Sequence, residues 1–98
     1  MTGFRLAPEA RSDIQEIWSY IANDSLDAAG RVRRAFLDAC RQLAKHPLIG
    51  HQRADLTTRG DVLFWPVYSY LIVYRPNTKP LEIVRVLHGK RDVRTVPP

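Results

Sequence analysis

Apolar residues recur at helical spacing through the first half of the chain. Pro8 suits the first turn of a helix, and this first helix is expected to end near residues 23–24. Asp24 or Ser25 can cap a second helix, which Pro47 stops. The apolar faces comprise Ala10, Ile14, Ile17, Trp18, Ile21 and Ala22 in the first helix, and Ala28, Val32, Ala35, Phe36, Ala39, Cys40 and Leu43 in the second. Two amphipathic helices with a short polar connection predict an antiparallel helical hairpin.

Gly30 lies inside the predicted second helix. Glycine at such a position costs up to about 1 kcal/mol relative to alanine, and close packing between helices is one reason for its presence.

The second half of the chain changes to the pattern of strands. Residues 62–67 and 70–74 are aromatic and β-branched with a tight connection between them, and residues 81–88 form a third run after a polar turn. Residues 3–7 alternate similarly and predict a short first strand. Because Pro66 has no N–H to donate, its strand is expected at the sheet edge or with a bulge there.

The order strand, helix, helix, strand, strand, strand predicts a small α+β domain. The helical hairpin would back one face of a mainly antiparallel sheet. A chain of 98 residues has room for one core, so residues 1–98 are expected to form a single domain, with a tail at residues 92–98. The loop at residues 47–61 is long enough to require a structural reason.

Composition fits a folded protein of a reducing compartment. Hydrophobic residues make up 45% of the chain and charged residues 26%, so disorder is not expected. Cys40 is the single cysteine, and its place on an apolar stripe predicts core packing rather than nucleophilic chemistry. No secretory signal is recognisable and no apolar run is long enough for a bilayer, so we expect a cytoplasmic protein without membrane contact.

Positive charge is concentrated after residue 30. The net charge is +5, yet residues 1–30 are acidic in balance, whereas residues 31–61 and 75–98 are basic. Such a surface attracts an anionic partner, either nucleic acid or an acidic protein segment. On the second helix Arg31 and Arg34 are candidates for this contact, although a merely solvated basic face is the more ordinary interpretation.

Aromatic residues lie in apolar runs, which favours packing over nucleic-acid stacking. A single-strand binder would interleave exposed aromatic side chains with positive charges. Packing is therefore expected for Trp18, Tyr20, Trp65, Tyr68, Tyr70 and Tyr74.

Arg85 lies within the last predicted strand. Its alternate spacing with Leu81, Ile83 and Leu87 would place one arginine on a face with three apolar residues. The arginine could be ion-paired over the core or could contact a partner.

His88 closes the same strand. Histidine can move protons near neutral pH, but no second titrating group is fixed beside it by spacing, so a histidine bonded to backbone is the simpler interpretation. His46 and His51 lack the spacing of metal ligands, and neither a metal nor another cofactor is expected.

Four segments, in this order, resemble the RelE/ParE superfamily of type II toxins. They are residues 7–21, which begin with APEA and end with DIQEIWSYI; residues 46–50, HPLIG; residues 70–75, YLIVYR; and residues 82–92, EIVRVLHGKRD. The pairing of the EIW helix with VLHGKRD is closer to the ParE branch. The resemblance implies a toxin that acts on DNA gyrase or a related type II topoisomerase and is neutralised by a cognate, ParD-like antitoxin.

RelE-type relatives instead cut messenger RNA in the ribosomal A site, and this chain lacks most of their cleavage residues. The resemblance would require lysines at residues 62–65, which read VLFW, and an arginine after Tyr70, where Leu71 stands. A tail tyrosine is replaced by Val96-Pro-Pro98, and only Arg91 remains. A binding toxin without enzymatic activity is therefore expected, with a ribosome-dependent endoribonuclease as the alternative.

Clustered charge marks the end of the chain as the expected contact with target or antitoxin. The residues concerned are Lys90, Arg91 and Arg94, together with Arg85 and His88. An antitoxin segment that is disordered alone could fold into an apolar groove beside the helical hairpin. Operator DNA recognition is not expected of this chain, because it normally belongs to the antitoxin. A third alternative is an inactive homologue.

Overall fold

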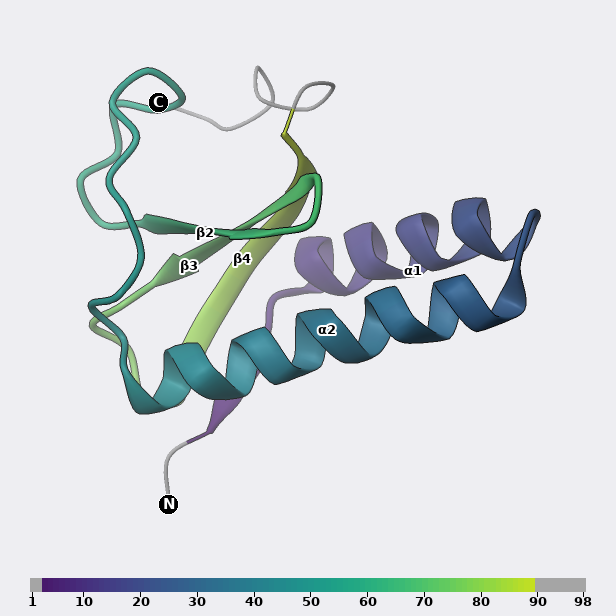
Figure 1. Ribbon diagram of the computed structural model, residues 1–98. Coiled ribbons are helices and arrows are strands. Elements are labelled where there is room, and N and C mark those ends of the chain that lie inside the picture. The colour runs from purple at the N-terminus through teal and green to yellow at the C-terminus, as the bar shows by residue number, and fades with distance from the viewer. Residues whose placement is uncertain (1–2, 90–98) are drawn as a thin grey trace.

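The computed structural model describes residues 3–89 of the chain, and its elements follow the predicted order (Figure 1). A short strand precedes two helices, and three strands follow. Their bounds are β1 Phe4–Leu6, α1 Pro8–Ala22, α2 Leu26–Lys45, β2 Leu63–Val67, β3 Tyr70–Arg75 and β4 Leu81–His88.

The strands form one mixed sheet in the order β1-β4-β3-β2. β1 runs parallel to β4, while the β4–β3 and β3–β2 pairs are antiparallel. The prediction of an α+β fold with a mainly antiparallel sheet is thus confirmed. Pro66 lies on the edge strand β2, as its missing N–H requires.

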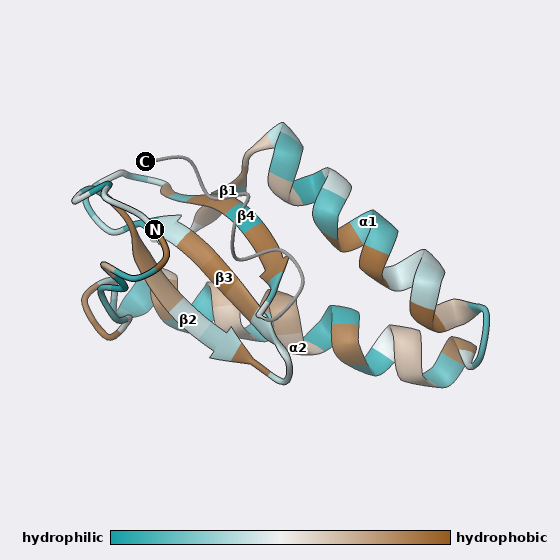
Figure 2. Cartoon of the chain, turned by 90° about the horizontal axis from the view of Figure 1, so that it is seen from above, coloured by the Kyte–Doolittle hydropathy of each residue, from teal (hydrophilic) through white to brown (hydrophobic). Residues whose placement is uncertain are grey.

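The two helices lie side by side and cover one face of the sheet, and the ends at which α1 joins α2 project beyond it (Figure 1). Ser25 is the residue that caps α2: its hydroxyl accepts a hydrogen bond of 3.1 Å from the Ala28 N–H. Hydrophilic residues recur along both helices, whereas β3 and β4 are mostly hydrophobic (Figure 2).

Buried side chains form two clusters, one on each face of the sheet. The larger cluster joins the helices to the sheet and includes Ala10, Ile14, Ile17, Phe36, Ala39, Cys40, Leu43, Ala44, Ile72, Tyr74, Leu81, Ile83 and Val86. The smaller cluster contains Val62, Phe64, Val73 and Leu87, with Leu56, Leu71 and Val84 packed against it. Cys40 is fully buried, as predicted, and burial raises the pKa of its thiol to about 12.

A β-bulge changes the predicted alternation of β4. Tyr74 pairs with Ile83 whereas Val73 pairs with Arg85, so Val84 is an extra residue in the ladder. Leu81 and Ile83 therefore face the helices, while Leu87 belongs to the cluster on the opposite face. The prediction that Leu81, Ile83 and Leu87 share one face was wrong, because a single extra residue reverses every side chain that follows it.

The reason suggested for Gly30 was also wrong. A Cβ added there would meet only the Arg34 Nη1 atom, at 3.6 Å, which is ordinary contact with the end of a flexible side chain. No neighbouring helix approaches closely enough to require glycine.

The long loop after α2 is held to the sheet at two points. The Tyr74 hydroxyl donates to the Pro47 carbonyl at 2.6 Å and accepts from the Gly50 N–H at 2.9 Å. A Cβ at Gly50 would collide with the Tyr74 ring. His51 then exchanges two backbone hydrogen bonds of 2.8 Å with Phe64, which covers part of the β2 edge.

Candidate functional site

His88 lies at the end of the sheet formed by the β2–β3 turn and the end of β4. Its ring packs edge-on against Tyr70, with centroids 5.5 Å apart, and Tyr70 packs edge-on against Phe36 of α2 at 5.4 Å. The following residue, Gly89, donates a backbone hydrogen bond of 2.8 Å to the Ser69 carbonyl. These contacts fix the histidine against the turn between β2 and β3.

A cavity of about 450 Å³ opens beside this histidine. We call this region, cavity and turn together, the turn site. The residues that line it are Arg53, Pro66, Tyr68, Ser69, Tyr70, Leu71, His88 and Gly89. Sequence reasoning did not place Arg53 here, because the long loop that carries it has no periodic pattern.

Tyr68 is a highly exposed side chain of the turn site. It is 72% exposed, and its backbone has φ of 54°, in the left-handed region that favours glycine. The prediction that Tyr68 packs in the sheet was wrong, as it was for Tyr20, which is 69% exposed at the projecting end of α1. Because strained backbone is often found at functional sites, Tyr68 is a candidate contact position.

Arg53 brings a cation to the turn site that is already paired. Its Nε donates to Asp55 Oδ1 at 3.0 Å and its Nη2 donates to Asp55 Oδ2 at 2.9 Å. These hydrogen bonds hold the pKa of the Asp55 carboxyl below its ordinary value and raise the pKa of Arg53. Arg53 therefore stays charged beside the cavity, with the Asp55 carboxylate as its exposed partner.

The described lining of the turn site can be compared with what RNA cleavage requires. Metal-independent cleavage of RNA needs a base, an acid and cations around the phosphate. Among the described residues that line the cavity there is one histidine and one arginine, and there is no lysine or carboxylate. An exposed tyrosine beside a histidine is suited to contact with a protein surface.

Arg85 is ion-paired to the first helix. Its Nε and Nη2 atoms donate to the two carboxylate oxygens of Asp13, at 2.7 and 3.0 Å, and the side chain is 28% exposed. Asp13 also accepts from the Val86 N–H at 2.9 Å, next to the bulge. Arg85 is therefore ion-paired, which is one of the two interpretations that the sequence allowed. A contact with a partner would have to use the exposed part of the side chain.

Arg31 and Arg34 lie on the exposed face of α2. Phe36 touches Tyr70 of the turn site, and Arg34 and Arg31 precede it by ~3 Å and ~7.5 Å along the helix axis. At about 3.6 residues per turn, Arg34 and Arg31 lie about 160° and about 140° round the helix from Phe36, so they are on the outer side of α2, away from the sheet. The remaining candidates, Lys90, Arg91 and Arg94, lie outside the described residues.

Within residues 3–89 no three side chains of the metal-binding types are grouped to hold an ion. None of the helices described is long and apolar enough to cross a membrane.

Comparison with known proteins gives a consistent family. The sequence model described as the ParE toxin of the type II toxin–antitoxin system, parDE, matches residues 4–93. Toxin ParE1 of Caulobacter vibrioides is 27% identical over 95 residues, which cover 96% of each chain. Toxin RelE3 of the same organism is 26% identical over 89 residues, 91% of this chain and 96% of the relative.

A solved structure shares the fold. A chain from the chromosomal ParDE toxin–antitoxin system of P. aeruginosa superposes with a TM-score of 0.74 and 15% sequence identity, covering 92% of this chain and 98% of its own length.

Proposed function

This chain belongs to the ParE toxin family of type II toxin–antitoxin systems, and we propose that it blocks DNA gyrase or a related type II topoisomerase by binding to it. In this proposal the toxin is not an enzyme, and a cognate ParD-like antitoxin neutralises it by covering its contact surface.

The observation that carries the proposal is the composition of the turn site. An exposed tyrosine, Tyr68, stands beside His88 in a cavity where Arg53, the one arginine among the described residues of its lining, is ion-paired with Asp55. Protein interfaces are rich in tyrosine and depend on such side chains, whereas phosphate cleavage depends on free cations. The turn site therefore supports binding as the mode of action.

The positive surface supports a target contact that extends beyond the cavity. Arg31 and Arg34 lie on the outer side of α2, the helix that contacts the turn site through Phe36, and the chain continues from Gly89 into the basic residues Lys90, Arg91 and Arg94. Replacing these last three together with glutamine should relieve growth arrest. Full growth arrest by that triple variant would remove the tail from the contact surface.

The antitoxin partner is supported by exposed apolar residues on the helical hairpin. Tyr20 and Leu26, at the projecting ends of α1 and α2, are 69% and 68% exposed. An amphipathic antitoxin helix could bury such residues while its acidic residues meet the basic face of α2. The solved relative is described as part of a ParDE system, which agrees with a partner of this kind.

Controlled expression in cells tests the proposal against ribosome-dependent RNA cleavage, the alternative favoured by the similarity to toxin RelE3. A topoisomerase-directed toxin should make cells filament and induce the DNA damage response. A nuclease should instead give codon-positioned cuts in messenger RNA, detected by primer extension, and leave DNA topology unchanged. The absence of any toxicity would indicate an inactive homologue.

A further inference from the structure

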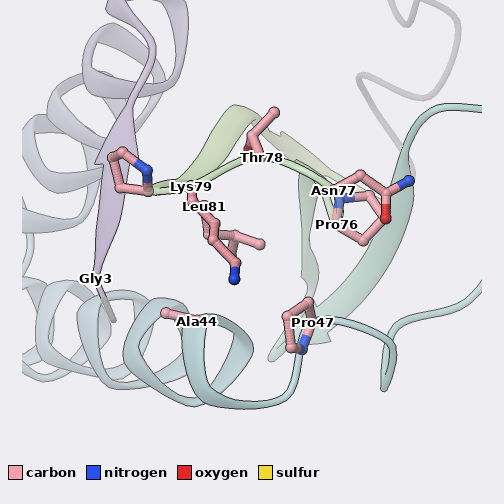
Figure 3. A pocket seen from close by; sticks show the side chains of 9 residues that line it. Gly3, Ala44, Pro47, Pro76, Asn77, Thr78, Lys79 and Leu81 are labelled. Carbon is pink, nitrogen blue, oxygen red and sulfur yellow. The ribbon is translucent and has the colours of Figure 1, made fainter. Parts of the chain in front are cut away.

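A second cavity lies where α2 ends and the β3–β4 turn passes over it (Figure 3). Its volume is about 540 Å³, within the range of binding pockets. The residues that line it are Gly3, Ala44, Pro47, Pro76, Asn77, Thr78, Lys79, Pro80 and Leu81. We call it the proline pocket, after the three prolines in its wall.

The wall of the proline pocket is mainly apolar, with one cation. Prolines, Ala44 and Leu81 offer aliphatic surface that an apolar side chain could cover. Lys79 extends into the cavity, with its nitrogen end on the side of Ala44 and Pro47 (Figure 3). An apolar cavity with a single directed charge is a typical arrangement for a specific ligand.

The Lys79 ammonium has no carboxylate partner in the part of the chain that the structure describes. The next acidic residue along the chain, Glu82 of β4, is ion-paired with two arginines. Arg5 forms an ion pair with it, and Arg75 Nη1 lies 3.4 Å from its Oε1 atom. The lysine is therefore available to a negative charge from outside.

The two other polar side chains of the pocket, Thr78 and Asn77, differ in whether they already form hydrogen bonds. The Thr78 hydroxyl is already satisfied, because it donates to the Arg75 carbonyl at 3.2 Å and accepts from the Glu82 N–H at 2.9 Å. No hydrogen bond is formed by the Asn77 amide among the described residues. The unused groups are thus an ammonium and an amide, both suited to a carboxylate.

We propose that the proline pocket anchors the antitoxin, taking an aliphatic side chain of an acidic antitoxin segment while a neighbouring carboxylate of that segment pairs with Lys79. This inference rests on the proposed function, since it requires an antitoxin. It adds a place of attachment that is separate from the target contact.

The separation follows from the topology. The proline pocket lies at the β3–β4 turn and the start of β1, whereas the turn site lies at the β2–β3 turn and the end of β4. Because β3 and β4 are antiparallel neighbours, these two turns are at opposite ends of the sheet. Changes in the proline pocket should therefore weaken antitoxin binding without altering inhibition of the target.

Three variants separate charge from shape. Lys79→Met removes the ammonium but keeps an apolar stem, and should weaken antitoxin binding ~2–5-fold, as loss of a partly exposed ion pair does. Lys79→Glu reverses the charge and should weaken binding ~10-fold. Gly3→Leu adds a side chain where an added Cβ meets nothing within 4 Å, so it should narrow the pocket without a clash and weaken binding ~10-fold.

Arg11→Glu is the matched control, because Arg11 is also an exposed cation but lies on α1, outside both the pocket lining and the basic face of α2. The dissociation constant of the full-length toxin for the antitoxin encoded beside it is measured by calorimetry, with thermal melts to show that each variant is folded. The control should stay within ~2-fold of the wild type. Inhibition of gyrase supercoiling by each variant alone should be unchanged.

The pocket as an anchor and the antitoxin as a partner are tested separately by these measurements. If the antitoxin binds wild type and all three pocket variants equally, the proline pocket is not an anchor, while the proposed function stands. If the neighbouring protein does not bind the wild-type toxin, the antitoxin part of the proposed function fails and this inference fails with it.

Discussion

Three individual residues have a strained backbone, a buried side chain or a long-range hydrogen bond that affects stability or function. Tyr68 combines an unfavourable backbone conformation with exposure, Cys40 is sealed in the core, and Tyr74 ties the loop after α2 to the sheet. The sequence predicted the burial of Cys40, because its stripe is local. It could not predict the exposure of Tyr68, because that depends on the turn geometry rather than on composition.

Replacement of Tyr68 should separate stability from activity. Tyr68→Gly removes a Cβ from the left-handed region and should raise the free energy of unfolding by about 1 kcal/mol, measured by urea denaturation. The same variant should inhibit its target more weakly, since an exposed aromatic contact is lost. Tyr20→Gly is not a suitable control, because it would weaken a helix. Tyr68→Asn, which tolerates the same backbone, should lose the contact with a smaller gain in stability.

The Cys40 thiol should make the protein less stable in alkaline solution. Its pKa is about 12 in the folded protein against 9.0 ordinarily, so between these values the unfolded chain releases a proton that the folded chain keeps. Stability is therefore full below about pH 9 and should fall by about 1 kcal/mol by about pH 10. Burial also raises the pKa of Tyr74, which acts in the same direction at higher pH.

Cys40→Ala provides the comparison, because it removes the thiol from the same site. Its unfolding free energy should change less between about pH 8 and about pH 10 than that of the wild type. Equal slopes would show that the thiol titrates normally. In the native wild type a thiol reagent should react only after unfolding.

At the scale of elements, local signals determined most boundaries. Pro8 begins α1, Ser25 caps α2 and Pro47 follows its end, and each acts through its immediate neighbours. The bulge in β4 was not predicted from the sequence. The Val86 N–H next to it donates to Asp13, which is on α1 and far away in sequence. A contact of this kind leaves no periodic trace in the chain.

The Asp13 carboxylate should be important for attaching α1 to β4. It accepts two hydrogen bonds from Arg85 and one from the Val86 N–H. Asp13→Asn should lower the free energy of unfolding by about 2–3 kcal/mol, because it removes the charge and leaves donors unsatisfied in a half-buried place. Asp38→Asn, which affects the exposed pair with Arg41, is the matched control and should change stability by less than about 0.5 kcal/mol. Similar losses in both variants would contradict the structural role of Asp13.

Replacement of Gly30 should increase the stability of α2. Gly30→Ala should stabilise the protein by about 0.5–1 kcal/mol, because the helix loses a flexible residue and the new methyl group meets only the end of Arg34. The rise in melting temperature is the measurement. A loss of stability would indicate a close contact at this position.

The whole molecule presents two ends with different chemistry. One end carries Tyr68 and His88, and the other carries the proline pocket with Lys79. The uneven charge and the fold order could be predicted from the sequence. The turn site could not, since Arg53 comes from the unpatterned loop and meets the sheet only after folding. The target would contact one end, and an antitoxin anchored at the other end would have to extend from there over the contact surface to neutralise the toxin.

Inhibition of DNA gyrase by the purified toxin tests the central claim most directly. Relaxed plasmid is incubated with gyrase, ATP and increasing amounts of toxin, and supercoiling is followed on agarose gels, with and without the cognate antitoxin. We expect supercoiling to fall with toxin concentration and to recover when the antitoxin is added. Undiminished supercoiling at a large excess of folded toxin, together with codon-positioned cuts in ribosome-bound messenger RNA, would contradict the proposal.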